Sequence, residues 1–439
     1  MTFDLLITGA TLVLPWGQEQ ADIAVKDGRI AAIGALGGAA AAHLLDARHW
    51  HVLPGVIDPH VHFRDPGNAA VESIPTGSRA AVLGGVTAVF DMPNTVPSII
   101  DEKTLAWKQD YVSGASYCDF GIYIGATKEN LPFLSAMESA PGVSAIKVFA
   151  GSSTGDLLVE DDDSIRAIMS DGRRRIMFHS EDEYRLQARR PLFSKGDPYR
   201  KHMEWRDPEC AFLGTRRIVA LAHQTGRPAH IAHVSTQEEY EFLGHHRDIC
   251  TAEVLVNHLT QIAPDCYDTL GGYAVMNPPI RDRRHYDAAW AAVNDGRIDT
   301  LGSDHAPHPR EHKERPWPDT AAGLTGVQTL VPIMLDHVHE GRLSLSRFAD
   351  LSSAGPARVY GIVNKGRLAV GFDADFTIVD LQAERTIEDD WIATPAGWTP
   401  FAGKKVTGWP KVTVVRGHVV MREDEVLGAP VGKLVKFRS

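Results

Sequence analysis

The sequence predicts an α/β protein, with a (β/α)8 TIM-like barrel and a small β-domain formed from both termini. Eight apolar or β-branched runs recur within residues 53–364, and a helical stretch follows each run. Strands that alternate with helices form parallel βαβ units, and eight such units make a closed barrel. Residues 1–52 and 365–439 are instead rich in short strands and turns. A doubly wound open sheet is the alternative, but no GxGxxG motif follows the first run.

The two ends of the chain share one texture of alternating strand and turn. DLLITGATLVL (4–14) is followed by ADIAVKDGRIAAIG (21–34), in which Asp27-Gly28 is a hairpin signal. Near the other end, GRLAVGFDADFTIVDL (366–381) and KVTVVRGHVVMRED (411–424) repeat the pattern. We therefore expect residues 1–52 and 365–439 to form one small sandwich-like β-domain, and residues 53–364 to form the barrel.

The central region supplies the barrel strands. In chain order they are HVLPGVIDP (51–59), GVTAVFDM (85–92), DFGIYIGA (119–126), SAIKVFAG (144–151), RIMFHS (175–180), PAHIAHV (228–234), AEVLVNH (252–258) and IDTLGSD (298–304). The charge-dense residues 188–209 interrupt this rhythm and are expected to form a long loop with helical pieces. A solvated face is the favoured interpretation of that loop, and a lid or an oligomer contact are the alternatives.

Composition and charge exclude several classes of protein. The chain has 45 basic and 56 acidic residues, so its net charge of −11 does not favour a nucleic-acid or anionic-membrane partner. The four cysteines lie far apart without a CxxC motif, so neither a disulfide framework nor a cysteine zinc site is indicated. No run reaches the roughly 18 apolar residues that a membrane span needs. We expect a soluble cytoplasmic protein.

Side chains that bind metals gather at the C-terminal ends of the predicted strands, where barrel enzymes carry their active sites. In an extended segment residues i and i+2 point the same way, so His60 and His62 can hold one ion. Lys147 lies in the apolar run AIKVFAG, where an unpaired ammonium would be costly to bury. The candidate ligands are His60, His62, Lys147, His179, His233 and Asp304. Imidazole and carboxylate without thiolate suit Zn²⁺, with Mn and Fe as alternatives.

This arrangement resembles the amidohydrolase superfamily over essentially the whole chain. In its binuclear members a lysine is carboxylated by CO2, and the carbamate bridges two metal ions. Lys147 matches that position, which would explain a lysine inside an apolar strand. The resemblance thus implies two Zn²⁺ per subunit and a carbamate on Lys147.

Local motifs are similar to those of the dihydroorotase family, in its longer bacterial form. The matching words are DPHVHFRDPG (58–67), MPNT (92–95), MNPPIR (276–281) and SDHAPH (303–308). By this resemblance the residues that bind the substrate are Arg64, Asn94 and His308 at its carboxylate, and Asn277, Ala322 and Gly323 at its ring. Two features depart from the pattern: Gln328 replaces a frequent glutamate, and many dihydroorotases of this length carry aspartate where Lys147 stands.

The implied reaction is the reversible, zinc-dependent hydrolysis of L-dihydroorotate to N-carbamoyl-L-aspartate in de novo pyrimidine biosynthesis. Asp304 would be the catalytic residue, first as general base and then as general acid. A hydantoinase or allantoinase is the nearest alternative, although its substrate lacks the carboxylate that Arg64, Asn94 and His308 would bind. A non-catalytic scaffold is a further alternative, but such relatives typically lack some of the metal ligands. The expected partners are the small-molecule substrate, further copies of the chain, and another enzyme of the pyrimidine pathway.

Overall fold

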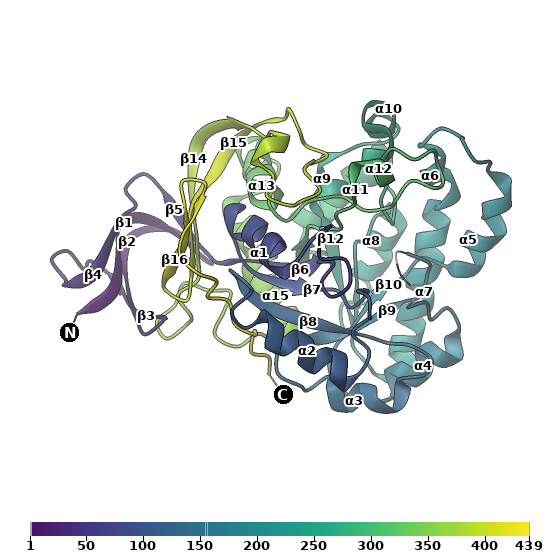
Figure 1. The fold of residues 1–439 in the computed structure, drawn as a ribbon, viewed down its shortest axis with the longest axis horizontal. Coiled ribbons are helices and arrows are strands. Elements are labelled where there is room, and N and C mark those ends of the chain that lie inside the picture. Colours follow the sequence, from purple (N-terminus) through teal and green to yellow (C-terminus); the bar gives the residue numbers. More distant parts are fainter. Residues whose placement is uncertain (1, 154, 156, 439) are drawn as a thin grey trace.

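A computed structural model of the chain describes residues 2–153, 155 and 157–438. Two sheets organise it, and Figure 1 shows the sheet of the terminal segments beside the barrel. The barrel sheet has eight parallel strands in the order β13-β12-β11-β10-β9-β8-β7-β6. Its two outer strands meet just beyond their ends, because the backbone N–H of His62 donates to the carbonyl of His305 at 2.7 Å. The predicted barrel fold is confirmed.

Each barrel strand lies within one of the eight predicted runs or overlaps it. The strands are β6 (Val56–Val61), β7 (Val86–Asp91), β8 (Asp119–Gly125), β9 (Val143–Phe149), β10 (Ile176–His179), β11 (Ala229–Ile231), β12 (Cys250–Leu255) and β13 (Thr300–Gly302). Nearly every residue in these strands is buried. Parallel strands are covered on both faces, and they therefore read as continuous apolar runs.

Helices follow the strands and surround the barrel (Figure 1). They are α1 (Ile74–Leu83), α2 (Glu102–Val112), α3 (Leu134–Met137), α4 (Asp162–Ser170), α5 (Glu183–Arg189), α6 (Lys201–Trp205), α7 (Pro208–Thr225), α8 (Gln237–Gly244), α9 (Val256–Thr260), α10 (Asp265–Leu270), α11 (Arg283–Asn294), α12 (Arg310–Lys313), α13 (Leu330–His339), α14 (Leu345–Ala349) and α15 (Gly355–Tyr360). The sequence explains the ends of α7: the Asp207 side chain caps its first turn, Pro208 opens it, and Gly226 ends it with a φ of 72°.

The second sheet has nine strands and combines the two ends of the chain. Its strands are β1 (Phe3–Leu14), β2 (Gly17–Lys26), β3 (Arg29–Gly34), β4 (Ala41–Asp46), β5 (His51–Pro54), β14 (Phe376–Thr386), β15 (Lys405–Val415), β16 (His418–Arg422) and β17 (Glu425–Val426). The link between the ends is β5, which pairs with both β1 and β14. The predicted run 51–59 is therefore two strands, of which only β6 belongs to the barrel, and β5 lies across the predicted domain boundary.

Two C-terminal segments leave this sheet and pack on the barrel. Leu434 forms a bridge with Phe120 on β8, and the ring of Phe437 lies 5.5 Å from that of Phe90 on β7. The other segment, residues 387–401, lies between β14 and β15 and contacts the loops at the C-terminal ends of the barrel strands. Among the described residues, no helix combines the length and the apolar character that a membrane crossing requires.

Candidate active site

Three of the predicted metal ligands meet where the first and last barrel strands adjoin. His60 lies on β6, His62 follows it, and Asp304 follows β13. The Nε2 atoms of His60 and His62 lie 3.3 and 3.1 Å from Oδ1 of Asp304. These donor atoms are mutually close enough to surround a single metal ion.

Two further histidines continue the cluster. Nδ1 of His179, at the end of β10, faces Nε2 of His233 at 3.0 Å. The ring of His233 in turn lies 5.4 Å from the ring of His60, so the two groups are adjacent. His233 and Asp304 have positive φ angles of 38° and 49°, which are costly for residues other than glycine. The surrounding structure holds both side chains in place against this cost.

Lys147 lies on β9 and is fully buried. Its Nζ has no hydrogen-bond partner among the described residues, although a charged ammonium needs several. Burial lowers the pKa of Lys147 to about 8, while the charges of Glu253 and Asp304 oppose that shift. The structure thus places all six predicted ligands in one region, with an unsatisfied lysine nitrogen among them.

The histidines are oriented by partners on their far sides. Nδ1–H of His60 donates to Glu253 at 2.7 Å, and Nε2–H of His179 donates to Glu181 at 2.9 Å. Because each ring donates outward, its unprotonated nitrogen faces the cluster, which is the arrangement that metal-binding histidines require. Burial also lowers the pKa values of His62, to about 4, and of His179, which keeps both rings neutral.

Sequence reasoning missed both glutamates. Glu253 carried the same signal as Lys147, a charged residue inside an apolar run, but the run AEVLVNH was interpreted only as a strand. Glu181 stands two residues after His179 and also pairs with the buried Arg206, from far along the chain, at 2.5 Å. No local pattern indicates that second contact.

We expect Glu253→Gln to lower metal affinity about 10- to 100-fold, because His60 would lose the carboxylate that orients and polarises its ring. Titration with a competing chelator measures the change. Glu239→Gln is the matched control: Glu239 is also buried, but its partners are Thr215 and Thr236 rather than a histidine. Equal metal affinity in the Glu253 variant and the wild type would contradict this role.

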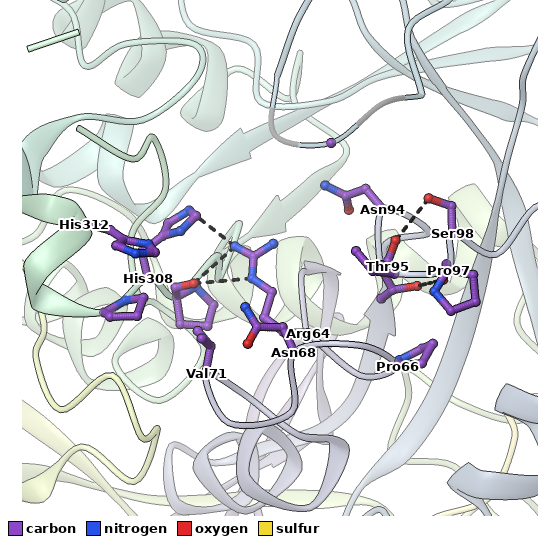
Figure 2. Close-up of a pocket in the computed structure, with 14 residues that line it drawn as sticks. Arg64, Pro66, Asn68, Val71, Asn94, Thr95, Pro97, Ser98, His308 and His312 are labelled. Atoms are coloured by element: carbon purple, nitrogen blue, oxygen red, sulfur yellow. Dashed lines mark hydrogen bonds between the residues drawn. The ribbon is translucent and has the colours of Figure 1, made fainter. Parts of the chain in front are cut away.

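A pocket of about 330 Å³ adjoins the cluster and is lined by Arg64, Asn94 and His308 (Figure 2). The guanidinium of Arg64 lies 3.4 Å from Nε2 of His308 and donates to the carbonyl of Pro307. Nδ1–H of His62 donates to Oδ1 of Asn94 at 2.7 Å, which connects the pocket to the metal-ligand cluster. Three of the predicted substrate-binding residues therefore share one cavity.

The other three predicted binding residues lie outside the lining of this pocket. Ala322 and Gly323 still approach it, because the carbonyl of Ala322 lies 3.2 Å from Nε2 of His308. A Cβ on Gly323, whose φ is 150°, would lie 2.9 Å from that same nitrogen. Only glycine lets the backbone come so close. Asn277 contacts His202.

A buried lysine that the sequence did not single out holds the loop around Gly323. Nζ of Lys313 donates to the carbonyls of Val275, Ala321 and Gly323 at 2.9, 2.6 and 2.8 Å. Lys313 comes from the charged word REHK, which is typical of an exposed turn of helix. Its three acceptors all lie outside α12, so local pattern could not reveal its burial.

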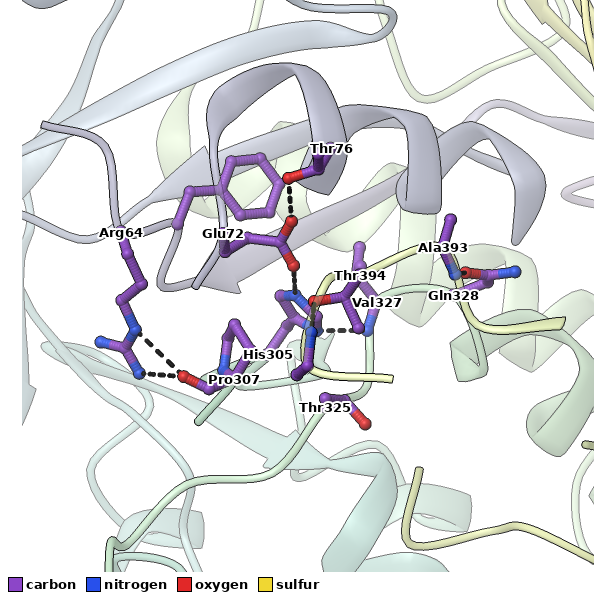
Figure 3. Close-up of polar contacts among 12 residues, drawn as sticks. Arg64, Glu72, Thr76, His305, Pro307, Thr325, Val327, Gln328, Ala393 and Thr394 are labelled. Atoms are coloured by element: carbon purple, nitrogen blue, oxygen red, sulfur yellow. Dashed lines mark hydrogen bonds and ion pairs between the residues drawn. The ribbon is translucent and has the colours of Figure 1, made fainter. Parts of the chain in front are cut away.

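A histidine beside Asp304 connects three loops at this end of the barrel (Figure 3). Nε2–H of His305 donates to Glu72 at 3.1 Å, and its Nδ1 accepts from the backbone of Gly326 at 3.0 Å. The carbonyl of Glu72 accepts from the backbone N–H of Arg64. The backbone positions of Arg64 and Asp304 are thus coupled through one buried network.

Gln328 has a role that an ionised glutamate could not fill. Its amide nitrogen donates to the carbonyl of Trp391 at 2.7 Å. Its amide oxygen accepts from the N–H of Ala393 at 2.9 Å (Figure 3). An ionised glutamate only accepts hydrogen bonds. The amide of Gln328 therefore matches both the donor and the acceptor that the neighbouring segment 387–401 presents.

Comparison with known proteins agrees with this geometry. Residues 50–146 match the dihydro-orotase-like family model, and residues 177–420 match the amidohydrolase family model. The dihydroorotase of Pyrococcus furiosus is 37% identical over 88% of this chain and 84% of its own length. The allantoinase of Solibacter usitatus is 32% identical over 99% of this chain and 97% of its own.

Solved structures show the same fold. The L-hydantoinase (dihydropyrimidinase) from Arthrobacter aurescens superposes with a TM-score of 0.93 at 30% identity, covering 99% of this chain and 100% of that one. Both the sequence and the structural relatives thus span nearly the whole molecule. The chain therefore belongs to the amidohydrolase family, as a dihydroorotase-like cyclic amide hydrolase that depends on metal.

Proposed function

We propose that the protein is a dihydroorotase, which hydrolyses L-dihydroorotate reversibly to N-carbamoyl-L-aspartate in de novo pyrimidine biosynthesis. The observation that carries this proposal is the pocket in which Arg64, Asn94 and His308 lie together, next to the metal-ligand cluster. A buried guanidinium can bind a carboxylate through two parallel hydrogen bonds. Dihydroorotate has such a carboxylate beside its cyclic amide, whereas hydantoin and allantoin do not.

The residues of the cluster fit two zinc ions. His60, His62 and Asp304 would hold one ion, His179 and His233 the other, and Lys147 would bridge them as a carbamate. The unpartnered Nζ of Lys147 supports that bridge, because a carbamate replaces an uncompensated cation with two anionic oxygens. When bound, the ions would activate water at neutral pH and polarise the carbonyl of the substrate.

Asp304 is the residue placed to move the proton. Burial raises the pKa of this carboxyl, but its contacts with the His60 and His62 rings outweigh burial and hold the pKa below its ordinary value, so Asp304 is ionised at neutral pH. It would accept a proton from the attacking water and deliver it to the ring nitrogen as the amide C–N bond breaks. In the cyclising direction Asp304 takes the proton from nitrogen and returns it to the departing water.

Substrate orientation falls to the remaining residues. Arg64, Asn94 and His308 would bind the carboxylate, while Asn277 and the backbone of Ala322 and Gly323 would contact the ring. Lys313 keeps the backbone of Gly323 in place through its carbonyl. The cyclic amide is then held in one orientation next to Asp304.

A direct assay tests the proposed function. Purified protein is offered dihydroorotate, hydantoin and allantoin, and the metal content of the same sample is measured. We expect turnover of dihydroorotate with about two zinc ions per chain. Preferred turnover of hydantoin or allantoin would overturn the dihydroorotase proposal and identify the protein as a hydantoinase or an allantoinase. Full metal occupancy without any turnover would point to a non-catalytic scaffold.

We expect Arg64→Lys to raise KM for dihydroorotate about 10- to 100-fold at nearly unchanged metal content, because a point charge replaces a planar two-pronged donor. Steady-state kinetics in both directions measure the change. Arg247→Lys is the control, since Arg247 is an exposed residue that pairs with Asp299 outside the pocket. Unchanged kinetics in the Arg64 variant would remove this residue from the carboxylate site.

We also place the enzyme in the cytoplasm, as a homo-oligomer that can associate with another enzyme of the pyrimidine pathway. All four cysteines are unpaired and buried, which suits a reducing compartment. Trp16, in the turn between β1 and β2, and Leu44, on β4, are exposed and would suit a contact between copies. Light scattering of the purified chain, alone and with aspartate transcarbamoylase, tests both associations.

A further inference from the structure

The charge-dense segment 188–209 is not simply a solvated face. It contains α6, whose His202 is 3% exposed, and Arg206, which directly follows α6 and is 2% exposed. Arg206 pairs with Glu181, the partner of His179, and also donates to the carbonyl of Ser152. One end of this short helix is therefore attached to the metal-ligand cluster.

His202 attaches the other end of α6 to Asn277. Nε1–H of the buried Trp317 points at Nδ1 of His202 at 3.3 Å. An indole nitrogen only donates, so this Nδ1 must be the acceptor and the ring proton must sit on Nε2. Nε2 lies 2.9 Å from Oδ1 of Asn277 and 3.0 Å from the carbonyl of Met276.

The protonation state of His202 is also settled by its surroundings. Burial lowers its pKa to about 3, and the charge of Arg206 adds to the effect. The ring is therefore neutral throughout the range in which the enzyme would work. With one proton on Nε2, it donates toward Asn277 and never accepts from it.

This donation decides which way the amide of Asn277 points. Because Oδ1 accepts from His202, the NH2 group must lie on the opposite side of the amide. Nδ2 has no hydrogen-bond partner in the part of the chain that the structure describes, and the residue is half-buried rather than sealed. A donor is thus left available at the position assigned to the substrate ring.

We propose that His202, oriented by Trp317, is a positioning residue that presents Nδ2 of Asn277 as a hydrogen-bond donor to a carbonyl oxygen of the cyclic amide. The inference rests on the proposed function, which sets Asn277 beside the ring. It makes Asn277 selective: a ring with a carbonyl oxygen at this position is bound, and a ring with an N–H there is refused. The specificity of the site then depends on a residue that need not touch the substrate.

The first test is His202→Leu. Without the ring donor the amide of Asn277 can rotate and present its oxygen, so we expect KM for dihydroorotate to rise about tenfold. Metal content and kcat should stay within about twofold of the wild type. In His202→Gln the new amide can accept from Trp317 and donate to Asn277, and most of the KM should be recovered. A KM unchanged in His202→Leu would overturn the proposal.

A double-mutant cycle separates positioning from general damage. If His202 acts through Asn277, adding His202→Leu to Asn277→Ala should change KM less than twofold. Additive effects of the two changes would overturn the proposal. His337→Leu is the matched control, because His337 is buried against Trp290, at 4.9 Å between rings, but contacts no residue assigned to the site. The His337→Leu variant should have a lower Tm than the wild type and an unchanged KM.

Two arrangements keep the test decisive. If His202→Leu does not fold, Trp317→Phe is tested instead. This variant keeps the His202 imidazole and an aromatic side chain at position 317 but removes the N–H that orients the imidazole. A higher KM with unchanged metal content would then support the positioning role of His202. The wild-type assay alone decides the proposed function. The double-mutant cycle is then measured with whichever cyclic amide the wild type hydrolyses. The positioning role of His202 and the assignment of the substrate can therefore fail separately.

Discussion

Replacing Asp304 with asparagine is expected to lower kcat about 10³-fold or more, while the fold and most of the bound metal remain. The asparagine oxygen can still face His60 and His62, but the amide can neither accept the proton of the attacking water nor return it to the ring nitrogen. Both directions of the reaction should fall together, because one group serves both. Stopped-flow or steady-state assays, with metal analysis of the same samples, measure the loss.

Asp375→Asn is the control for this change. Asp375 is also buried, but it lies directly before β14 of the terminal sheet and pairs with Lys365. Its variant should retain kcat even if Tm decreases. Near-native kcat in the Asp304 variant would mean that another group moves the proton. His258 is then the next residue to test, because its Nδ1 is buried without a hydrogen-bond partner among the residues that the structure describes, and its Nε2 lies 3.3 Å from the carbonyl of Pro278.

Lys147→Ala should bind much less metal and be nearly inactive. The carbamate forms when the amine nitrogen attacks CO2 and loses a proton, and the variant has no nitrogen to carry it. Short carboxylates such as acetate or propionate are expected to restore part of the activity by occupying the vacated position. Activity measured against carboxylate concentration, with metal content in parallel, checks this expectation.

The same site predicts a requirement for CO2 during metal loading. Protein stripped of metal at low pH should recover activity with zinc faster when bicarbonate is present, because only the carbamate makes Lys147 an anionic ligand. Carbon-13 bicarbonate should give an NMR signal that Lys147→Ala lacks. An ordered structure at neutral pH with an unmodified Lys147 beside two occupied metal positions would contradict the carbamate. One metal with a free lysine would reduce the site to a mononuclear one.

Some parts of the site were predictable because their signal is local. A histidine pair at i and i+2, or a lysine in an apolar strand, conflicts with ordinary core composition, and barrel topology then brings the strand ends together. The pocket residues Arg64, Asn94 and His308 were assigned through motifs, and the structure places all three around one cavity.

Other residues could not be predicted because their partners are distant in the sequence. Lys313 and His202 each lie in a charged stretch of sequence that is typical of a surface, and both are buried by segments from other parts of the chain. The strand β5 was assigned to the barrel because it is continuous with β6 in the sequence, although its pairing partners are β1 and β14. Pairing across the whole chain is invisible to local periodicity.

The segment 387–401 has a consequence for how the protein is made. Nε1–H of Trp398 donates to the carbonyl of His308 at 2.8 Å, and the hydroxyl of Thr325 donates to the carbonyl of Trp398 at the same distance. This segment is anchored by β14 and β15, which the ribosome produces after all the barrel strands from β6 to β13. Because these contacts join residues that are distant in the sequence, the entropic cost of closing the loop between them arises late in folding. A nascent chain can therefore pair its barrel strands before residues 387–401 exist, and the loops of His308 and Thr325 gain their contacts with Trp398 only after β14 has been made.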